Sequence, residues 1–551
     1  MAATSGHRLP RVTKPELAVF VSGVASMGLE ILAVRIVAPQ FGSSIYVVGG
    51  IITVVLAALS LGYWRGGKRA AGYASNDRLI WILLFTALYV AFLIFARDLV
   101  LSWTSTMPLP SRYASLPAII LLFGPPTYLL GFISPYAAEL SHKSGVGEAS
   151  GHVYALGTIG SILGAGATTY FLIPVMGVDG IGLLFGVLLV GTAFVIAAPR
   201  FPRAPVAATV LVTLVLFAAV GSGSMGYSVH GEVVYETQTP YQQLEVIDSG
   251  DTRTMYLDGA RHSAMDLEDP DRHVFTYTKY FHAPYLFVDD PDEIDRVLFI
   301  GGGGYTGPQA FEERYDASID VVEIDPTVEA AAKEYFGLEE SETLNLYTDE
   351  GRQFLDETDE TYDVIVVDAY KQDKVPFELT TTEFMELTHD RLSDDGVLVA
   401  NVISAPDGPA SEFYRSQYKT MDRVYPQVYS FPTSESSSIQ NVQLIATTSD
   451  ERVSQETLYE RNAERDIGID LEDELATYRA DVDTSGVPIL EDDNAPVDSL
   501  LDPMVGQRYV VEETDPTSEN DEPSSAPEDA ENESASDTDR LEPPTPKIRA
   551  G

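Results

Sequence analysis

The residues best suited to chemistry lie in one stretch, Arg296 to Pro326 (RVLFIGGGGYTGPQAFEERYDASIDVVEIDP). An apolar run ends in four glycines, a helix-compatible segment follows, and a second apolar run ends at Glu323 and Asp325. Glycine adopts positive φ and lets a ligand approach the backbone. The glycines satisfy G-x-G-x-x-G, and an acid follows about 20 residues later, where nucleotide-binding folds hold a ribose. The stretch therefore predicts a nucleoside-binding strand–turn–helix–strand unit rather than a structural turn.

The elements that would position this unit form an α/β pattern. Apolar runs predict strands, with helices between them, in a doubly wound sheet at 296–304, 319–325, 344–349, 363–369, 396–403 and 442–448. Before them, 228–260 alternates apolar and polar residues around turns at Ser249-Gly250-Asp251 and Asp258-Gly259, which predicts β-hairpins. A helix-like stretch follows from His273 to Phe287.

The predicted soluble domains have these boundaries. We expect a β-hairpin subdomain over 228–290 and a Rossmann-like domain over 291–450, followed by an acidic helical extension over 451–510. Residues 511–551 are rich in Glu, Asp, Ser and Pro, cannot bury enough apolar surface to fold, and are predicted to be a disordered acidic tail.

The charge of the chain is strongly acidic and unevenly distributed. Its 551 residues carry a formal net charge of −47. Residues 1–222 hold 13 Lys and Arg against 7 Asp and Glu, which leaves 22 against 75 in the remainder. Phosphate affinity comes from clustered Lys and Arg, so we expect no nucleic-acid partner. We interpret the acid as a solvated surface adapted to high salt, and hence a halophilic source. Full stability of the soluble half in dilute buffer would contradict this interpretation.

The composition also restricts metal and thiol chemistry. Cysteine is absent, which excludes disulfides, thiolate metal sites and thiol catalysis. The 8 histidines are scattered without metal-ligand spacing, so we predict no metal site.

Residues 16–222 have the pattern of a multi-pass membrane domain, after a short basic N-terminus (1–15). A cleaved signal peptide fits poorly because apolar segments keep recurring. The fourth segment contains Gly124-Pro125-Pro126, which could kink it or make it re-entrant. The fifth contains a G-x-x-x-G at Gly160 and Gly164, typical of closely packed helices. The seven segments of membrane length are 16–38, 46–64, 79–97, 115–136, 152–174, 179–198 and 204–222.

Two ionisable residues, Glu30 and Arg35, fall inside the first apolar segment. Charge in the hydrocarbon core is costly, so such residues are either functional or form buried pairs. Five residues apart, they do not share one helical face, and each is expected to have a partner on another helix. Both are therefore membrane-site candidates, with a substrate or transfer role for Glu30 as the alternative to a structural pair.

The loops between these segments raise a conflict about orientation. The N-terminus and the 65–78, 139–151 and 199–203 loops hold 10 Lys and Arg, whereas the opposite short loops hold only Arg97 and Arg112. The positive-inside rule therefore places the N-terminus in the cytoplasm. Seven spans would then place the acidic half outside the cell membrane, where nucleoside cofactors are scarce. Either one span is miscounted, or the rule fails here, or the soluble half does not use a cytoplasmic cofactor.

The soluble half resembles the spermidine synthases, the polyamine aminopropyltransferase family, over about 230–450. The motifs occur in the family's order: Y-Q-x-x-x-V from Tyr241, Y-L-D-G from Tyr256, G-G-G-G from Gly301, V-E-I-D-P from Val322, D-E-G-R-Q-F-L from Asp349 and Y-D-V-I-V-V-D-A from Tyr362. The apolar half, with GLEILAVRIVAPQFGSS at 28–44, looks like the fused membrane form of this family. LEDDNAPV at 490–497 is similar to a C-terminal signature of those fused proteins.

The resemblance implies a fold and a donor. The fold is a multi-pass α-helical membrane domain followed by an α/β doubly wound, Rossmann-like methyltransferase-type domain with an N-terminal β-hairpin subdomain. The donor is S-adenosylmethionine or its decarboxylated form, with no metal. The glycines would face the sulfonium-bearing chain, Glu323 the ribose hydroxyls, and Asp349 or Glu350 the adenine edge. The implied cofactor-binding residues are Gly301, Gly302, Gly303, Gly304, Glu323, Asp325, Asp349 and Glu350.

The resemblance also implies a base and an amine pocket. An ammonium must be held and lose a proton before it attacks the carbon next to sulfur, which requires a carboxylate. Asp368, at the C-terminal end of a predicted strand, would be this base and Asp373 a second carboxylate for the amine. The alternative for Asp368 is a helix cap or turn residue. The substrate-binding candidates are Gln242, Tyr256, His262, Tyr277 and His282.

Several positions depart from the family pattern. Gly304 and Tyr305 replace the acid and glycine of G-G-G-D-G, and His262-Ser263 replaces the usual Gln-Ser. Tyr277-Thr278-Lys279 stands where the family has Y-H-E, so one carboxylate is missing. Lys279 would repel a polyamine if it lined the same pocket. The nucleoside-binding part of the pattern is therefore better retained than the amine-binding part.

Three functions are compatible with these patterns. The first is a membrane-bound transferase that moves an aminopropyl-type group to a small amine. The second is a transferase whose bundle binds lipid and which modifies a lipid or lipid-anchored protein, as in lipoprotein biogenesis, with an outward-facing soluble domain that has lost its cofactor. The third is a transporter or sensor with a polyamine-binding domain. The expected partners are the lipid bilayer and a small amine or lipid-linked acceptor, and a homodimer is compatible with the family resemblance.

Overall fold

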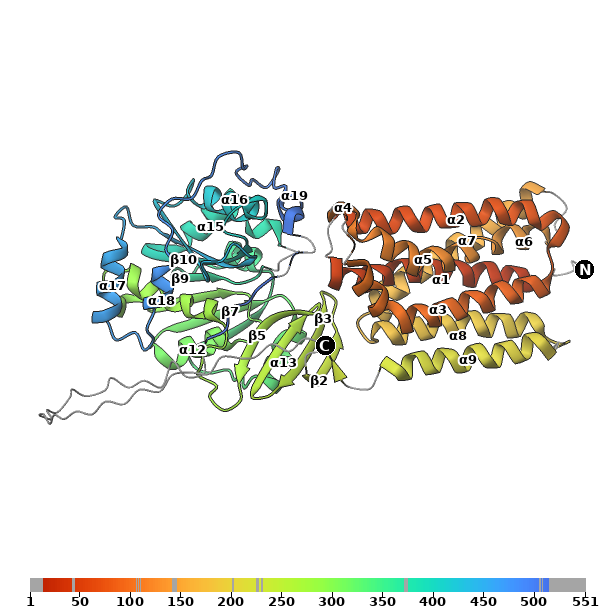
Figure 1. Cartoon of the computed structure of the whole chain (residues 1–551), viewed down its shortest axis with the longest axis horizontal. Coiled ribbons are helices and arrows are strands. Elements are labelled where there is room, and N and C mark those ends of the chain that lie inside the picture. Colours follow the sequence, from red (N-terminus) through yellow and green to blue (C-terminus); the bar gives the residue numbers. More distant parts are fainter. Residues whose placement is uncertain are drawn as a thin grey trace, which may run out of the picture. The chain divides into compact units, whose positions relative to one another are not determined.

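Two regions of different architecture make up the chain, a bundle of long helices in its first part and an α/β region after it (Figure 1). The computed structural model describes residues 13–41, 45–105, 107, 109, 111–140, 146–200, 203–223, 227–228, 231–370, 375–504, 507 and 509–514.

The bundle confirms the seven predicted spans. Each is a helix, or a run of helices, long and apolar enough to cross a membrane. Large apolar side chains such as Phe95, Ile162 and Phe217 are exposed, which is typical of helices that face lipid. The spans are α1 (Lys14–Phe41), α2 (Ile45–Tyr73), α3 (Asn76–Ser105), α4 to α6 (Ser111–Ala114, Leu116–Leu130, Ile133–Glu139), α7 (Val146–Ala167) with a π-helical continuation (Thr168–Leu172), α8 (Val178–Ala197) and α9 (Arg203–Gly223).

The fourth span does not turn back at its prolines, so the re-entrant alternative is wrong. Helix α5 continues through Pro125 and Pro126 to Leu130, and the chain turns only at Gly131 and Phe132. Pro125 lacks the N–H that would bond to the carbonyl of Leu121. The Tyr89 hydroxyl of α3 donates to that carbonyl instead. A neighbouring helix therefore satisfies the acceptor that the proline leaves free.

The glycines of α7 bring its backbone close to α1, as predicted. A Cβ added at Gly160 would lie 2.2 Å from the carbonyl oxygen of Phe20, and one at Gly164 would lie 2.3 Å from that of Val24. Any larger residue would force the two helices apart, so this motif serves helix packing.

The second region is built on a seven-stranded sheet, in the order β11-β12-β10-β9-β6-β7-β8. Strands β6 to β10 are parallel, and β12 is antiparallel to both β10 and β11. The doubly wound fold is confirmed, with the strand order reversing between β6 and β9. The strands are β6 (Arg296–Ile300), β7 (Ser318–Glu323), β8 (Leu344–Thr348), β9 (Tyr362–Val367), β10 (Leu392–Ser404), β11 (Gln427–Pro432) and β12 (Gln440–Thr447). Strand β11 was not predicted, because a six-residue run ending in proline gives a weak strand signal.

Helices cover the sheet and extend beyond it. Those between the strands are α12 (Thr306–Arg314), α13 (Pro326–Tyr335), α14 (Gly351–Glu357), α15 (Thr382–Asp390) and α16 (Glu412–Met421). The C-terminal extension contains α17 (Gln455–Glu464), α18 (Glu472–Ala476) and α19 (Val497–Leu501). Apolar clusters lie on both faces of the sheet, so the central parallel strands are mostly buried, whereas the edge strand β8 is partly exposed.

The predicted hairpins form a five-stranded antiparallel sheet in chain order. Its strands are β1 (Tyr227–Ser228), β2 (Gly231–Gln238), β3 (Gln243–Ser249), β4 (Thr252–Leu257) and β5 (Ala260–Asp266). The helix-like stretch that follows is three short pieces, α10 (Thr276–Lys279), a 3₁₀ turn (Tyr280–His282) and α11 (Pro284–Phe287). Pro284 lacks an N–H and therefore cannot continue the preceding helix.

Residues 511–514 correct the predicted boundary of the acidic tail. The backbone N–H of Thr276 donates to the carbonyl oxygen of Glu512 (3.0 Å), and Glu513 forms an ion pair with Arg261 (2.5 Å). Pairing with an ordered segment provides the backbone partners that composition alone did not reveal. The rest of the predicted tail, 515–551, lies outside the described residues.

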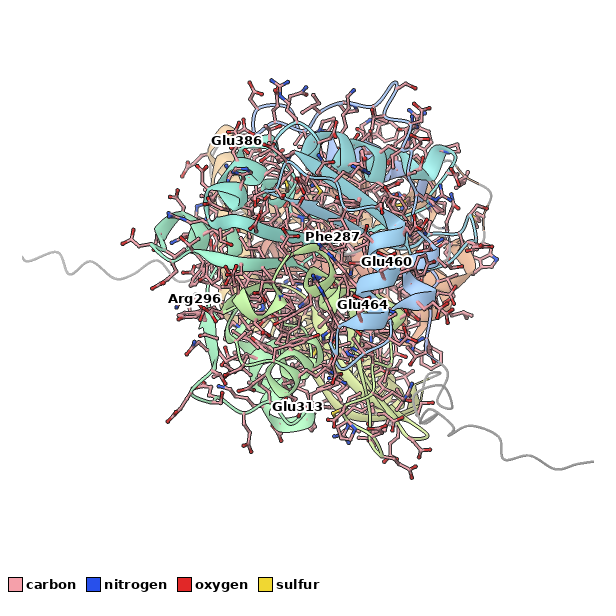
Figure 2. The ribbon with its side chains drawn as sticks, turned by 90° about the vertical axis from the view of Figure 1, so that its left-hand side faces the viewer. Phe287, Arg296, Glu313, Glu386, Glu460 and Glu464 are labelled. Atoms are coloured by element: carbon pink, nitrogen blue, oxygen red, sulfur yellow. The ribbon has the colours of Figure 1, made fainter. Side chains whose placement is uncertain are left out.

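Acidic side chains are spread over the surface of the α/β region. Glu313 on α12, Glu386 on α15, and Glu460 and Glu464 on α17 are all exposed and come from three different helices (Figure 2). This distribution supports a solvated acidic surface rather than a single cation site.

Candidate active site

A cavity of about 470 Å³ lies at the carboxyl ends of the parallel strands. One wall comes from the sheet, and the other comes from the hairpin subdomain, the segment 375–379 and α19. This is the edge at which open α/β sheets bind ligands. The sheet wall contains Ile300, Gly301, Val322, Glu323, Ile324, Asp349, Glu350, Gly351, Asp368 and Ala369, and the opposite wall contains Tyr241, Gln242, Leu257, His262, Val375, Pro376, Phe377, Glu378, Leu379 and Asp498.

The glycine loop after β6 is shaped by close backbone contacts. Gly301 has φ +98°, and a Cβ there would lie 2.5 Å from the carbonyl oxygen of Asp368. The N–H groups of Gly302 and Gly303 donate to Glu323 Oε2 (3.0 and 3.4 Å), and that of Gly304 donates to Ser263 Oγ (2.8 Å). These amides, which in dinucleotide sites bind a pyrophosphate, are therefore already engaged by the protein. Gly301 lines the cavity, whereas Gly302, Gly303 and Gly304 do not.

Glu323 is held in place by the backbone and lines the cavity. Its Oε1 accepts from the N–H of Asp325 (3.0 Å), in addition to the glycine bonds to Oε2. Burial raises the pKa of this carboxyl, and the backbone hydrogen bonds oppose that rise. Each carboxylate oxygen has two acceptor positions, so Oε1 can still accept one hydrogen bond from a ligand hydroxyl.

The other predicted acids of the sheet wall also form caps and turns. Asp349 Oδ1 accepts from the N–H of Glu350 (2.8 Å), and the Glu350 carboxylate caps α14 through the N–H groups of Arg352 (3.0 Å) and Gln353 (2.9 Å). Both acids line the cavity. Asp325 does not line it: the residue is fully buried and caps α13. Asp325 was expected to bind the sulfonium donor, but its carboxylate caps α13 instead.

Asp368 is the titratable group at the centre of the site. Its Oδ1 accepts from Asn401 Nδ2 (2.7 Å) and its Oδ2 accepts from the hydroxyl of Tyr277 (3.4 Å). Burial raises the pKa of Asp368 to about 6, while the two hydrogen bonds oppose that rise. Both contacts are with side chains, which argues against the alternative of a helix cap.

A buried polar network lies behind this carboxylate and was not predicted from the sequence. Asn401 Oδ1 accepts from Asn441 Nδ2 (2.9 Å) and from Gln443 Nε2 (2.7 Å). The hydroxyl of Tyr509, close to the end of the described chain, donates to Asn441 Oδ1 (2.6 Å). The network fixes the amide orientation of Asn401, so that its NH₂ group faces Asp368.

The hairpin subdomain supplies three of the predicted substrate residues. Gln242 and His262 line the cavity, and the Tyr277 hydroxyl also donates to the carbonyl oxygen of His262 (3.1 Å). Burial and the Asp368 charge raise the pKa of Tyr277, so it remains a donor. Tyr256 is buried in β4 and does not line the cavity.

His282 lies in the core, away from the cavity. Its ring is fully buried, with Nδ1 2.9 Å from the hydroxyl of Tyr315 and Nε2 3.1 Å from Nε2 of His273. Burial holds the pKa of His282 well below its usual range. A substrate contact, as expected from the family pattern, is not open to this ring.

Two departures from the family pattern are explained by packing. Lys279 forms an ion pair with Glu474 (3.2 Å) and does not line the cavity, so the expected repulsion of a polyamine does not arise there. Tyr305 is fully buried with φ +59°, and its ring fills the space beside Gly302, where a Cβ would lie 2.4 Å from Tyr305 Cζ. It therefore packs under the glycine loop and does not line the cavity.

The electrostatic character of the cavity is strongly negative. Six carboxylates and no Lys or Arg occur among its described lining residues, and His262 is the one lining side chain that can gain a positive charge. Like charges in a cleft are costly to bring together. The cavity is therefore suited to a cationic ligand and unsuited to a phosphate.

Two of these carboxylates, Glu378 and Asp498, were not among the predicted site residues. Glu378 follows the segment 371–374, which is outside the described residues together with the predicted Asp373. Asp498 lies one residue beyond the LEDDNAPV signature, and this position was the only sequence signal for it. Among the described residues, no group of three or more His, Asp or Glu has a metal-binding arrangement.

The two membrane-site candidates have different surroundings. Arg35 donates from its guanidinium to the carbonyl oxygens of Thr239 (3.0 Å) and Pro240 (2.5 Å). The expected partner on another span is therefore wrong: this side chain lies near the end of α1 and contacts the loop before the cavity residue Tyr241. Glu30 is half-buried in α1 and has no hydrogen bond or ion pair within the described part of the chain.

Comparison with known proteins links this site to one family. Residues 276–438 match the family model described as spermine/spermidine synthase domain. The chain is 32% identical over 208 residues to a polyamine aminopropyltransferase of Vibrio vulnificus, covering 36% of this chain and 67% of that protein. It is 28% identical over 286 residues to a probable polyamine aminopropyl transferase of Bifidobacterium longum, covering 49% and 62%. The chain thus spans about two thirds of the length of these relatives.

Among solved structures, a probable spermidine synthase from Corynebacterium glutamicum is 18% identical to this chain. The alignment covers 48% of this chain and 97% of that one, with a TM-score of 0.40.

Proposed function

The chain belongs to the spermidine synthase family of polyamine aminopropyltransferases, and on this premise we propose that it is a membrane-bound transferase that moves an aminopropyl-type group from a nucleoside sulfonium to an amine. The donor is S-adenosylmethionine or its decarboxylated form. The observation that carries this proposal is the ring of carboxylates around a cavity without described Lys or Arg. Both a sulfonium donor and an ammonium acceptor are cations, and a carboxylate-lined cavity stabilises them.

The glycine loop supports a nucleoside rather than a nucleotide in this cavity. A phosphate would need free backbone N–H groups, but those of Gly302 and Gly303 donate to Glu323. Glu323 in turn has one acceptor position left, on Oε1, for a ribose hydroxyl. Asp349 and Glu350 line the same wall further along the sheet edge, where an adenine edge can donate to a carboxylate.

Asp368 is proposed to accept the proton of the acceptor ammonium. The neutral amine then attacks the carbon next to sulfur, a new C–N bond forms, and the C–S bond breaks with its electron pair going to sulfur. The nucleoside leaves as a neutral thioether. A carboxyl with a pKa of about 6 is ionised at neutral pH, yet it holds a proton better than an ordinary aspartate.

Donor binding and turnover test this proposal on the full-length protein. Calorimetry should detect both sulfonium nucleosides, and mass spectrometry should detect the thioether product when an amine is added. Asp368→Asn should lower kcat by about 10²- to 10⁴-fold with donor affinity largely kept, whereas the exposed Asp356→Asn should not. Preferential binding of a phosphorylated nucleotide would contradict the proposal.

We further propose a cell-membrane location, for which the loop charges and the proposed donor favour opposite orientations of the α/β region. Nucleoside cofactors are scarce outside the cell, which favours an α/β region on the cytoplasmic side. The Lys and Arg of the loops instead favour a cytoplasmic N-terminus, and seven crossings would then put the α/β region outside. Protease added to the outside of intact cells should then degrade residues beyond 223. If this region is protected until the cells are lysed, it faces the cytoplasm.

A further inference from the structure

Exposed apolar side chains of the α/β region gather at the cavity. Six large apolar residues in the described part of 231–514 are exposed, and three of them line the cavity: Tyr241 (43% exposed), Ile324 (42%) and Phe377 (47%). Single exposed apolar residues need no explanation, but a group around one opening does. In a region with such an excess of acid, this apolar rim indicates contact with something other than water.

The loop that carries one rim residue is attached to the membrane-spanning bundle. Thr239 closes the loop: its N–H donates to the carbonyl oxygen of Gln242 (2.8 Å), and its Oγ1 accepts from the N–H of Tyr241 (3.0 Å). The Arg35 guanidinium of α1 donates to the carbonyl oxygens of Thr239 and Pro240. Arg35 is six residues from the end of α1, or about 9 Å along the helix. The rim therefore lies close to the end of a membrane span.

The α19 side of the cavity has a second contact with the bundle. Asp498 on α19 lines the cavity, and the 3₁₀ turn that follows α19, Asp502–Met504, packs against α4, at the start of the fourth span. Burial raises the pKa of Asp502, and the nearby Arg112 guanidinium opposes that rise. Two separate edges of the cavity are thus held against span ends within one compact unit.

We propose that the acceptor is the primary amine of a membrane lipid that carries no phosphate beside this amine, because the carboxylates of the cavity would repel one. The apolar chain of the lipid stays in the bilayer while the amine enters the cavity. This rests on the proposed function and specifies its acceptor. The rim residues contact the apolar part of the lipid next to the headgroup, and the carboxylates hold its ammonium. Asp368 takes one proton from that ammonium, the nitrogen bonds to the carbon next to sulfur, and the C–S electron pair goes to sulfur. A water-soluble diamine would need neither an apolar rim nor attachment to the spans.

The test uses the full-length protein in phosphatidylcholine vesicles with decarboxylated S-adenosylmethionine labelled in its aminopropyl group. Three acceptors are compared: sphinganine in the vesicles, soluble 2-amino-1,3-propanediol, which has the same amine without the apolar chain, and 1,4-diaminobutane. Phosphatidylcholine has no N–H to lose and serves as the blank. We expect the label in sphinganine at about ten times the rate of the soluble amino-propanediol or more, because the bilayer presents the lipid at high effective concentration.

The outcomes separate the two proposals. Equal or faster transfer to a soluble amine keeps the proposed function and overturns the lipid acceptor, as does label found in protein. Donor binding without transfer to any of the three also overturns the lipid acceptor. Absence of donor binding contradicts the proposed function itself.

Rim variants give a second readout. Tyr241→Ser with Phe377→Ser should lower transfer to sphinganine about tenfold more than transfer to 1,4-diaminobutane, since only the lipid contacts the rim. Val234→Ser with Leu267→Ser removes two equally exposed apolar side chains that do not line the cavity, and should change neither rate. An equal loss with both acceptors in the rim variant would overturn the proposal.

Discussion

The two walls of the cavity are constructed differently. The sheet wall consists of strand ends and one glycine loop. Its carboxylates at Glu323 and Glu350 are fixed by backbone N–H groups within a few residues or one strand away, whereas Asp368 is held by side chains from other elements. The opposite wall is assembled from a hairpin loop, the segment 375–379 and α19. Contacts between residues close in sequence shape most of the sheet wall, which suits it to a donor that stays the same. The opposite wall comes from separate segments, so its residues can differ with the acceptor. The following variants test that contrast.

The largest effect is expected at the glycine loop. Gly301→Ala should destabilise the protein by about 3 kcal/mol and lower kcat/KM by about 100-fold or more, because φ is positive and the new Cβ would meet the backbone of Asp368. Thermal unfolding and steady-state kinetics measure both. Gly337→Ala is the matched control, since Gly337 has φ +71° but nothing within 4 Å. Gly337→Ala should lower the free energy of unfolding by about 1 kcal/mol and leave kcat/KM unchanged. Similar losses in both variants would mean that only backbone strain matters.

The next effect concerns donor affinity. Glu323→Gln should weaken binding of the sulfonium nucleoside by about 10- to 100-fold, because charge-assisted hydrogen bonds to the ribose and to the glycine loop are lost. Calorimetry gives the dissociation constant directly. The exposed Glu339→Gln should bind the donor normally. Unchanged affinity in Glu323→Gln would place the ribose elsewhere.

A smaller effect is expected at the opposite wall. Glu378→Gln and Asp498→Asn should each raise the KM of the amine acceptor by about three- to tenfold, because each removes one charge facing the ammonium. The dissociation constant of the donor should change less than the KM of the acceptor. The exposed Asp493→Asn controls for net charge. If the dissociation constant of the donor changed more than the KM of the acceptor, the assignment of the opposite wall to the acceptor would be wrong.

The pH profile should follow Asp368. With a pKa of about 6, this base is protonated and inactive at low pH, so kcat/KM should fall tenfold per pH unit below about 6 and level off above it. The Asn401 hydrogen bond lowers this pKa, so Asn401→Ala should move the acid limb to higher pH by up to about one unit, with little change at pH 8. Asn345→Ala breaks a similar bond, to Asp320 (2.9 Å), away from the cavity. If the acid limb moved by the same amount in Asn345→Ala, the shift could not be due to loss of the Asn401–Asp368 hydrogen bond.

The smallest effect is expected beneath the glycine loop. The hydroxyl of Tyr305 is buried and has no hydrogen-bond partner among the described residues. Tyr305→Phe should therefore leave the free energy of unfolding unchanged or raise it by up to about 1 kcal/mol. Tyr362→Phe should lower it by about 1 kcal/mol, because the Tyr362 hydroxyl donates to Asp320 (2.9 Å). Chemical denaturation of both variants measures the difference. Marked destabilisation by Tyr305→Phe would indicate a role for its hydroxyl.

Much of this protein could be predicted from the sequence. The seven spans, the hairpin sheet and the doubly wound core follow from residue periodicity and from glycine turns, which act over a few neighbouring residues. The same locality explains why Gly301, Glu323, Asp349, Glu350 and Asp368 were found in the cavity as expected: the carboxyl ends of parallel strands always meet at one edge.

Tertiary structure alone decided the rest, because those contacts join residues far apart in the chain. Lys279 was expected to oppose an amine, but Glu474 neutralises it almost 200 residues later. His282 shares the family pattern with the site residues, yet packing places it in the core. Asn401 becomes the partner of Asp368 only when β10 lies beside β9. Local conformational preference determined the fold and the donor wall, while long-range packing determined the environment of the base and the acceptor wall.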